Sequence, residues 1–498
     1  MRKQLYCFIA VLLIGVLIGT GIYYTQEYRY YNMESNDLFL YDGADIENKI
    51  GQSGGLALLI ASFLSQFMRI PYVGICIMVI LYMSIAWIAF RVFQYKMSGW
   101  RMAGLSLLPI TFLYLCMEND YYHFQGHIAF LLMMLALWGY LSISDSKWKI
   151  RLIVGLVLIP LLYQLAGSIV WVFVVVACLS DLFGKGIKAC WALLYPLIAL
   201  FIACILVENS IVDTWETALT PFMYYNWPST YFFPLYAWGT IPLLWIVAWG
   251  LTKIPMKPTT EYLCGVFGGI LSFYMAADIY HKVHSRSSYR FLQEQYWAEQ
   301  GDWDRIIETA DRRQPVFFIS HLNLALAKKG LLVQKGKQYN QQPISKLMYP
   351  DPNLKNGMSL QSKVYLSWGY TGAARQAAFD ANLVTPGSCH PRQMQVMVQT
   401  NLVLGSYDVA EKYISVLEKT LFYDEWASSM RKFLNNPEAV SQDGILSELY
   451  HSLPLTDEYI RYEGLWGDMR DILEVCPSHP ILSQFYKFYQ LLEKEEQL

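Results

Sequence analysis

Long apolar stretches recur through about the first 280 residues of the chain. A membrane-spanning helix needs about 20 mainly apolar residues, because the hydrocarbon core of a bilayer is about 30 Å thick. The first stretch, Gln4–Tyr24, follows Arg2 and Lys3 and is not followed by a small-residue cleavage site, so it predicts an uncleaved anchor. Eight further stretches complete a prediction of about nine spans: Pro71–Ala89, Met102–Met117, Ile128–Leu141, Leu152–Leu165, Ser168–Leu179, Cys190–Leu206, Leu235–Leu251 and Glu261–Ile279.

One further apolar stretch, residues 54–68, is too short to span and predicts a helix in the membrane interface. Lys and Arg collect in the cytosolic loops of membrane proteins. With residues 54–68 on the outer side, the cationic clusters all fall on one face: Arg2, Lys3, Arg91, Lys96, Arg101, Lys147, Lys149, Arg151, Lys185, Lys188, Lys253 and Lys257. The opposite loops, residues 118–127, 163–168 and 208–233, contain no Lys or Arg. The charges predict a multi-pass protein of the bacterial inner (cytoplasmic) membrane, with a cytoplasmic N-terminus and a C-terminal half in the periplasm or outside the cell.

The composition of the chain changes near residue 280. Residues 1–279 contain 15 Lys or Arg and 15 Asp or Glu, whereas residues 280–498 contain 23 and 25, which is ordinary for a soluble domain. The sequence therefore predicts an all-α fold in two domains. The first is a transmembrane helical bundle over residues 1–279, and the second is a soluble α-helical domain over residues 280–498.

Three stretches of the second half share one pattern, in which a glycine and an aromatic residue precede a helix with small residues. They begin at Gly301, Gly369 and Gly405. Glycine permits a tight turn, and small residues let two helices approach closely. The pattern resembles degenerate tetratricopeptide repeats over residues 289–498. The resemblance implies a stack of helix pairs that binds a partner protein along its concave face. The alternative is that this array only packs against the membrane part.

Several classes of protein are disfavoured by what the sequence lacks. The formal net charge is -2 and no basic stripe occurs, so nucleic acid is not an expected partner. Phosphate-loop, dinucleotide-binding, zinc-protease and hydrolase motifs are absent from the sequence. Ionisable residues are nearly absent from the predicted spans, which argues against an ion-coupled transporter. Cys389 and Cys476 lie in the second half and could form a disulfide, but no cysteine spacing predicts a metal site.

The predicted outer loops hold the candidate chemical groups, because polar residues on loops of a rigid scaffold are the usual place for chemistry. The first two loops supply carboxylates and the third supplies aromatic rings that suit a membrane interface or a sugar. The candidate catalytic residues are Asp37, Asp42, Glu118 and Asp120. The candidate substrate-binding residues are His123, His127, Trp215 and Tyr225. His123 and His127 are four residues apart, as metal ligands on a helix can be, but a solvated or hydrogen-bonded pair is the favoured alternative and we predict no metal.

The layout of residues 1–278 resembles that of membrane glycosyltransferases with the GT-C fold. In that family, a first span leads to a long outer loop with a catalytic carboxylate and interfacial helices, and a second acidic loop follows two spans later. The resemblance implies transfer of a sugar from a polyprenyl-phosphate donor in the outer leaflet, with a carboxylate as the base. Asp37 or Asp42 would be that base, and Glu118, Asp120 or His123 its partner. The first loop lacks the paired acidic residues of the family.

Two other functions stay open at this point. The chain could be a non-catalytic membrane scaffold whose helical domain recruits envelope proteins, or a component of a lipid or polysaccharide exporter. The segment Gly54–Phe67 also resembles uncharacterised bacterial envelope proteins that join a membrane half to a repeat-like tail, but that resemblance implies no activity.

Overall fold

Helices form the regular structure of the described chain, as the sequence predicts. The computed structural model describes residues 2–36, 38–94, 101–144, 146–225, 232–313, 315–339, 341, 355–453 and 464–496. The chain divides into two compact units, which we call unit 1 and unit 2. Unit 1 consists of Met1–Glu34 and Asp42–Ser285, and unit 2 consists of Ser35–Tyr41 and Arg286–Leu498.

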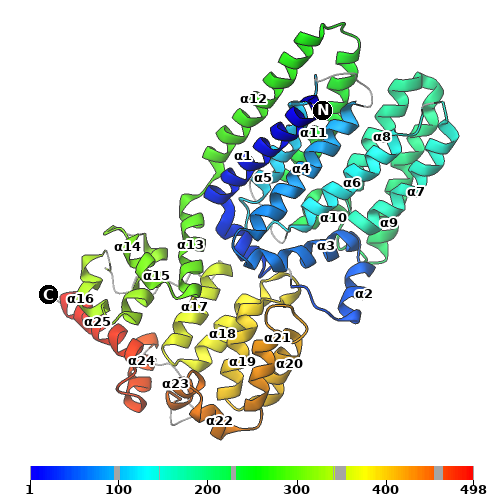
Figure 1. The fold of residues 1–498 in the computed structure, drawn as a ribbon. Helices are drawn as coiled ribbons and strands as arrows, with labels where there is room; N and C mark the ends of the chain where they lie inside the picture. The colour runs from blue at the N-terminus through cyan, green and yellow to red at the C-terminus, as the bar shows by residue number, and fades with distance from the viewer. Residues whose placement is uncertain are drawn as a thin grey trace. The chain divides into compact units, whose positions relative to one another are not determined.

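Unit 1 holds the apolar helices (Figure 1). In chain order these are α1 (Arg2–Met33), α2 (Gly43–Gly51), α3 (Gly55–Ser65), η1 (Gln66–Arg69), α4 (Val73–Gln94), η2 (Leu105–Leu107), α5 (Leu108–Cys116), α6 (Gln125–Leu141), α7 (Trp148–Ala166), α8 (Val170–Lys185), η3 (Gly186–Leu193), α9 (Leu194–Glu208), α10 (Trp215–Leu219), η4 (Pro221–Tyr224), α11 (Phe233–Thr252) and α12 (Pro258–Val283). Within the bundle, α4 packs against α1 and α6, and α5 packs against α11 and α12.

In the described part of the chain, five helices are long and apolar enough to cross a membrane, and each overlaps a predicted span. They are Val73–Gln94, Trp148–Ala166, Ala189–Glu208, Phe233–Thr252 and Pro258–Val283. Shorter apolar helices cover three more predicted spans and the predicted interfacial segment: Leu105–Cys116, Gln125–Leu141, Val170–Phe183 and Gly55–Arg69. The first predicted span lies within α1, but the side chains of residues 1–13 are outside the described part of the chain.

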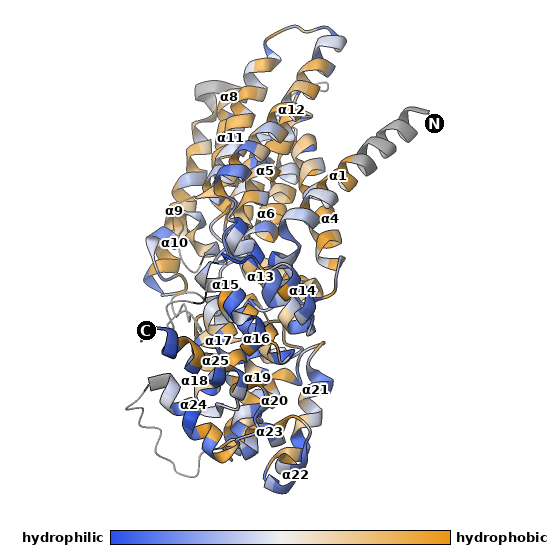
Figure 2. Cartoon of the chain, turned by 90° about the vertical axis from the view of Figure 1, so that its left-hand side faces the viewer, coloured by the Kyte–Doolittle hydropathy of each residue, from blue (hydrophilic) through white to orange (hydrophobic). Residues whose placement is uncertain are grey.

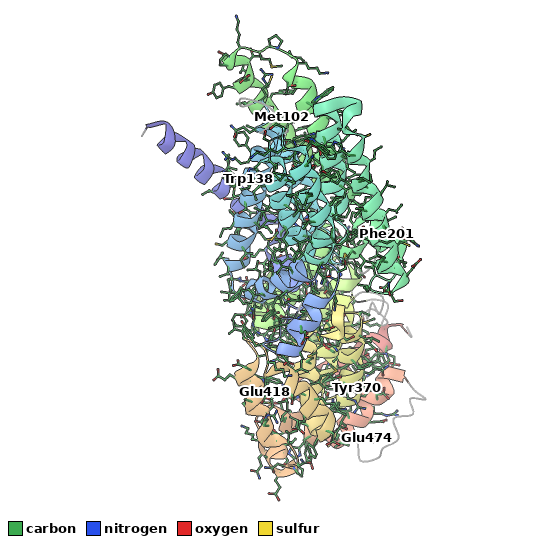
Figure 3. All side chains as sticks on the ribbon, turned by 90° about the vertical axis from the view of Figure 1, so that its right-hand side faces the viewer. Met102, Trp138, Phe201, Tyr370, Glu418 and Glu474 are labelled. Atoms are coloured by element: carbon green, nitrogen blue, oxygen red, sulfur yellow. The ribbon has the colours of Figure 1, made fainter. Side chains whose placement is uncertain are left out.

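Large apolar side chains are exposed on the helices of unit 1. Phe201 projects from α9 and is 65% exposed, and Phe267 and Phe273 are similarly exposed on α12 (Figure 3). Figure 2 shows apolar residues along α9, α11 and α12, whereas the helices of unit 2 mix apolar and polar residues. Contiguous apolar surface of this kind is unusual on a protein surrounded by water, and it is typical of contact with lipid.

A buried ion pair joins α7 to α8 inside unit 1. Arg151 Nη2 lies 3.1 Å from Asp181 Oδ1, and the Tyr140 hydroxyl donates to Asp181 Oδ2 at 2.6 Å. The Tyr195 hydroxyl lies 2.9 Å from that of Tyr140. An isolated buried ion costs several kcal/mol, so the two charges and two hydroxyls satisfy one another. The sequence analysis treats Arg151 only as a cytosolic charge and does not identify this pair.

Unit 2 begins with the segment Ser35–Tyr41, whose Tyr41 N–H donates to the Lys419 carbonyl at 2.7 Å, and resumes at α13. Its helices are α13 (Arg286–Gln300), α14 (Trp303–Glu308), α15 (Val316–Lys328), α16 (Leu332–Lys335), η5 (Gly336–Gln338), α17 (Lys355–Ser367), α18 (Thr371–Leu383), η7 (Pro386–Ser388), α19 (Pro391–Val403), α20 (Tyr407–Leu417), α21 (Asp424–Met430), η8 (Arg431–Phe433), α22 (Pro437–Gln442), α23 (Leu446–His451), α24 (Gly464–Val475) and α25 (Pro480–Glu496). Cys389 and Cys476 are both free thiols.

The three glycines singled out in the sequence lie in turns between consecutive helices of unit 2. Gly301, Gly369 and Gly405 have φ angles of 71°, 74° and 72°, in the left-handed region that favours glycine. At Gly369 a Cβ would also lie 2.6 Å from the Ser452 Cβ, so the turn requires the absence of a side chain. From α17 to α20, each helix packs against the next (Figure 1). Buried alanines on α18 allow this close packing.

Candidate functional site

Two of the predicted carboxylates, Glu118 and Asp120, lie beside α1. After α5 ends, the chain continues turning, because the Glu118 N–H donates to the Leu115 carbonyl at 3.1 Å and the next N–H donates to the Cys116 carbonyl at 3.2 Å. This turn directs both carboxylates toward Arg29 on α1. The loop after α5 and the first helix therefore build one charged cluster in unit 1.

Arg29 is buried and holds both carboxylates. Its Nη1 donates to Asp120 Oδ1 at 2.6 Å, and its Nη2 donates to Glu118 Oε2 at 3.2 Å. Two charge-assisted hydrogen bonds from one rigid guanidinium fix the separation of the two carboxylates. Arg29 reaches this position because residues 25–33 contain neither Gly nor Pro, so α1 continues past the predicted end of the first span.

Two further side chains donate to Glu118. Gln26, one turn before Arg29 on α1, donates from Nε2 to Oε1 at 3.4 Å. His284, directly after α12, lies with Nδ1 2.9 Å from Oε2, and its ring stacks on Tyr280 at 4.5 Å between centroids. An ionised carboxylate only accepts, so His284 Nδ1 is the donor. Glu118 thus accepts hydrogen bonds from three side chains on both of its oxygens.

These partners decide the charge of Glu118, whose side chain is only 3% exposed. Burial by itself raises the pKa of a carboxyl, but the hydrogen bond from His284 and the positive charge of Arg29 outweigh it and leave the pKa of Glu118 below its ordinary value. Glu118 therefore stays ionised, and both of its oxygens accept hydrogen bonds. A group in that state is a poor proton acceptor and a good structural anchor.

Asp120 differs from Glu118 in its exposure. Its side chain is 34% exposed, and only Oδ1 receives the Arg29 guanidinium. Within the described part of the chain, no hydrogen bond to its Oδ2 is found. Asp120 is therefore held in position by a buried cation while its side chain stays partly exposed, which is an arrangement that suits a general base.

The loop before α6 and the segment after η4 meet next to this cluster. Tyr122 and Tyr225 form an isolated antiparallel bridge, their ring centroids lie 5.2 Å apart, and the His123 N–H donates to the Tyr224 carbonyl at 2.9 Å. The predicted substrate-binding residues His123 and Tyr225 are thus brought together through the backbone. Tyr225 is 9% exposed, so its ring lies mostly within the protein.

The histidine pair does not form a metal site in the described residues. His127 is fully buried on α6, with Nε2 3.2 Å from the Tyr82 hydroxyl. Across the residues that the structure describes, no group of three or more His, Cys, Asp or Glu side chains is arranged to hold a metal ion.

The remaining predicted residues are not placed in the Arg29 cluster. Asp37 lies outside the described residues. Asp42 directly precedes α2, and its side chain makes no capping hydrogen bond to that helix. Trp215 lies on α10 and is 46% exposed.

Arg29, Gln26 and His284 belong to the site but are not among the residues predicted from the sequence. Arg29 and Gln26 stand three residues apart, which places them on one side of a helix, and this spacing was the available signal. His284 carries no local signal, because its contact with Glu118 joins positions 166 residues apart.

Comparison with known proteins gives one match. A family described as a family of unknown function, DUF6057, matches residues 2–497 of the chain. No match was found among curated proteins or among solved structures.

Proposed function

We propose that this chain, which belongs to the DUF6057 family, is an integral membrane transferase that moves a sugar from a polyprenyl-phosphate donor, with Asp120 as the general base. The observation that carries the proposal is the partly exposed side chain of Asp120, whose Oδ1 is fixed by the buried Arg29. The apolar helices that are long enough to span a bilayer support the membrane part of the proposal. The likeness of the layout to the GT-C fold supports the reaction class.

The reaction needs one proton acceptor at the outer face of the membrane. The acceptor hydroxyl or amide attacks the anomeric carbon of the donor, and its proton moves to Asp120 Oδ2. The bond between the anomeric carbon and the phosphate oxygen breaks, and the polyprenyl phosphate leaves with the electron pair. Arg29 does not touch the substrate in this scheme, and its role is to position Asp120. Among the other predicted carboxylates, Glu118 would hold Arg29 in place.

The membrane topology is part of the proposal. The N-terminus lies in the cytoplasm, and unit 2 lies in the periplasm or outside the cell, as the cationic loops predict. A reporter enzyme that is active only in the cytosol, fused after Leu498, should be inactive. An active reporter would place unit 2 in the cytoplasm and remove the outer-leaflet donor from reach.

Transfer by the full-length protein in lipid nanodiscs, with radiolabelled polyprenyl-phosphate sugars as donors, tests the chemistry. Asp120→Asn should lower the rate about 10²- to 10⁴-fold, because the amide keeps its shape but cannot accept the proton. Asp278→Asn is a matched control, since Asp278 is an exposed carboxylate paired with Lys282. Equal rates for the wild type and Asp120→Asn would contradict the proposal.

A second candidate function is that of a non-catalytic scaffold whose helical domain recruits envelope proteins. It is favoured because both carboxylate oxygens of Glu118 already accept hydrogen bonds from the protein. A carboxylate that accepts from Arg29, Gln26 and His284 links α1 to the residue after α12 and performs no chemistry of its own. The glycine turns of unit 2, which resemble tetratricopeptide repeats, support partner binding. In-cell crosslinking through residues 286–498 should then recover one stable envelope partner, with Asp120→Asn retaining function in the cell.

A further inference from the structure

Unit 2 contains a cavity of about 240 Å³ that none of the preceding proposals uses. Residues of α13, α14, α15, α17 and α23 line it, together with His479, which directly precedes α25. Half of the lining residues are apolar, and four of these are leucines. Among the polar lining residues, His321 and Gln295 are buried and mark the inner end, whereas Lys328 and Glu448 are exposed and mark the opening.

The inner end holds polar atoms that lack hydrogen-bond partners among the described residues. His321 is fully buried, and neither of its ring nitrogens has such a partner, since the nearest carboxylate oxygen, Glu294 Oε2, is 3.7 Å from Nδ1. Burial lowers the pKa of His321 to about 3, so the ring is neutral and offers one donor and one acceptor. The carbonyl oxygen of the buried Gln295 amide is likewise without a partner. Buried polar atoms of this kind are rare and require a partner.

The opening of the cavity carries one cation and one anion that are not joined. Lys328 and Glu448 are both exposed, and they interact electrostatically, yet no ion pair within 4.0 Å is found between them in the described structure. His479 is buried, lines the same cavity and feels the charges of both residues. Its Nδ1 accepts the Leu482 N–H at 3.2 Å, which assigns the proton of the neutral ring to Nε2 and makes that nitrogen a donor. The opening therefore offers a cation, a neutral donor and a carboxylate.

We propose that this cavity binds a free α-amino acid. The carboxylate of the ligand would accept from Lys328 and His479 Nε2, and its ammonium group would donate to Glu448. The side chain would lie along the apolar wall with a polar tip at His321 and Gln295. A cavity of this volume suits one small molecule of the size of an amino acid. A zwitterion suits the opening because it satisfies both separated charges at once.

The test is isothermal titration calorimetry of the full-length protein in detergent with each of the twenty free amino acids. At least one with a polar side-chain tip should bind, and its N-acetyl and methyl-ester derivatives should bind at least tenfold more weakly, because each lacks one charge. Lys328→Ala and Glu448→Gln should each weaken binding at least tenfold. Both positions are exposed, so the fold should tolerate these changes. Lys329→Ala is the matched control, since Lys329 pairs with Asp304 and does not line the cavity.

A second contrast separates recognition of the zwitterion from general charge effects. Glu448→Gln should bind the free amino acid and its N-acetyl derivative about equally, because the group that distinguishes the ammonium is gone. The proposal is overturned if no amino acid binds, if the N-acetyl derivative binds the wild type as tightly as the free amino acid, or if a tetrapeptide ending in the same residue binds more tightly. Binding that survives both charge-removing variants would also overturn it.

Discussion

Each unit of the molecule buries a glutamate, and the two glutamates are in opposite states. Glu118 in unit 1 accepts from Arg29, Gln26 and His284, and its pKa lies below the ordinary value. Among the described residues, Glu294 in unit 2 accepts a hydrogen bond only from Arg290, at 2.9 Å on one oxygen. Burial raises the pKa of Glu294 to about 7. Burial acts in the same direction on both carboxyls, so the number of donors decides the outcome. A buried carboxylate is therefore a stable anion only where the fold supplies enough donors.

The largest loss of stability that this comparison predicts is for a substitution of Arg29. Replacing Arg29 by Met leaves Glu118 as a buried charge without its cation and should lower the free energy of unfolding by about 3–5 kcal/mol. Titration of the detergent-solubilised protein with sodium dodecyl sulfate measures this change. The double variant Arg29→Met/Glu118→Gln should recover part of the loss, because no uncompensated charge then remains. A loss below about 1 kcal/mol for Arg29→Met would show that the cluster is solvated.

The second prediction concerns the pH dependence that Glu294 gives to unit 2. Its folded pKa lies above the unfolded value near 4.5, so its contribution to stability is complete below pH 4.5 and is lost as the pH rises through about 7. The loss should be about 3 kcal/mol by pH 8. Glu294→Gln should remove this slope, which thermal unfolding at several pH values between 4.5 and 8 measures. A wild type and a variant with parallel pH profiles would contradict the raised pKa.

A smaller effect is expected at His284, the third donor to Glu118. His284→Phe keeps the ring stack on Tyr280 but removes one hydrogen bond to a charged group, so stability should fall by about 2 kcal/mol at neutral pH. The folded pKa of Glu118 is lowered, so its contribution to stability is present above the unfolded pKa and is lost as the pH falls through the folded pKa. The variant should therefore lose less stability on acidification than the wild type. Acid-unfolding curves of the two proteins provide the measurement.

The smallest effect is expected at Arg290, the one donor to Glu294. Its side chain is 28% exposed and partly solvated, so Arg290→Met should cost less than about 1 kcal/mol at pH 7. Denaturant unfolding of this variant beside His284→Phe gives the comparison directly. A larger loss for Arg290→Met than for His284→Phe would mean that exposure, and not the number of donors, separates the two glutamates.

Local patterns in the sequence predict the helices and the turns of this molecule well. The apolar stretch from Pro71 to Ala89 lies within α4 apart from its first two residues, and Gly369 has the left-handed backbone that its turn requires. These features depend on residues that are close together in the chain, so they can be predicted from the sequence. The grouping of Glu118 with Asp120 is likewise local.

Contacts between distant positions could not be predicted from one sequence. The sequence predicts that Arg29 lies in the first outer loop, whereas in the structure it lies on α1, which continues to Met33. Only the folded chain places Arg29 between two carboxylates. His284 and the pair of Arg151 with Asp181 are similar cases, because nothing within a few residues of any of them indicates the partner. The sequence identifies the carboxylates, and the structure identifies what holds them.

The segment Ser35–Tyr41 has a consequence for how the protein is made. These seven residues follow α1 and leave the ribosome before the other apolar helices, and 244 residues separate them from the rest of their unit. The first-made segment of unit 2 must therefore wait until the Lys419 carbonyl has been synthesised before its Tyr41 N–H finds that acceptor. A tail expressed from Arg286 onward lacks one of its own pieces, so recombination that exchanges the tail alone would not transfer a complete folding unit between proteins.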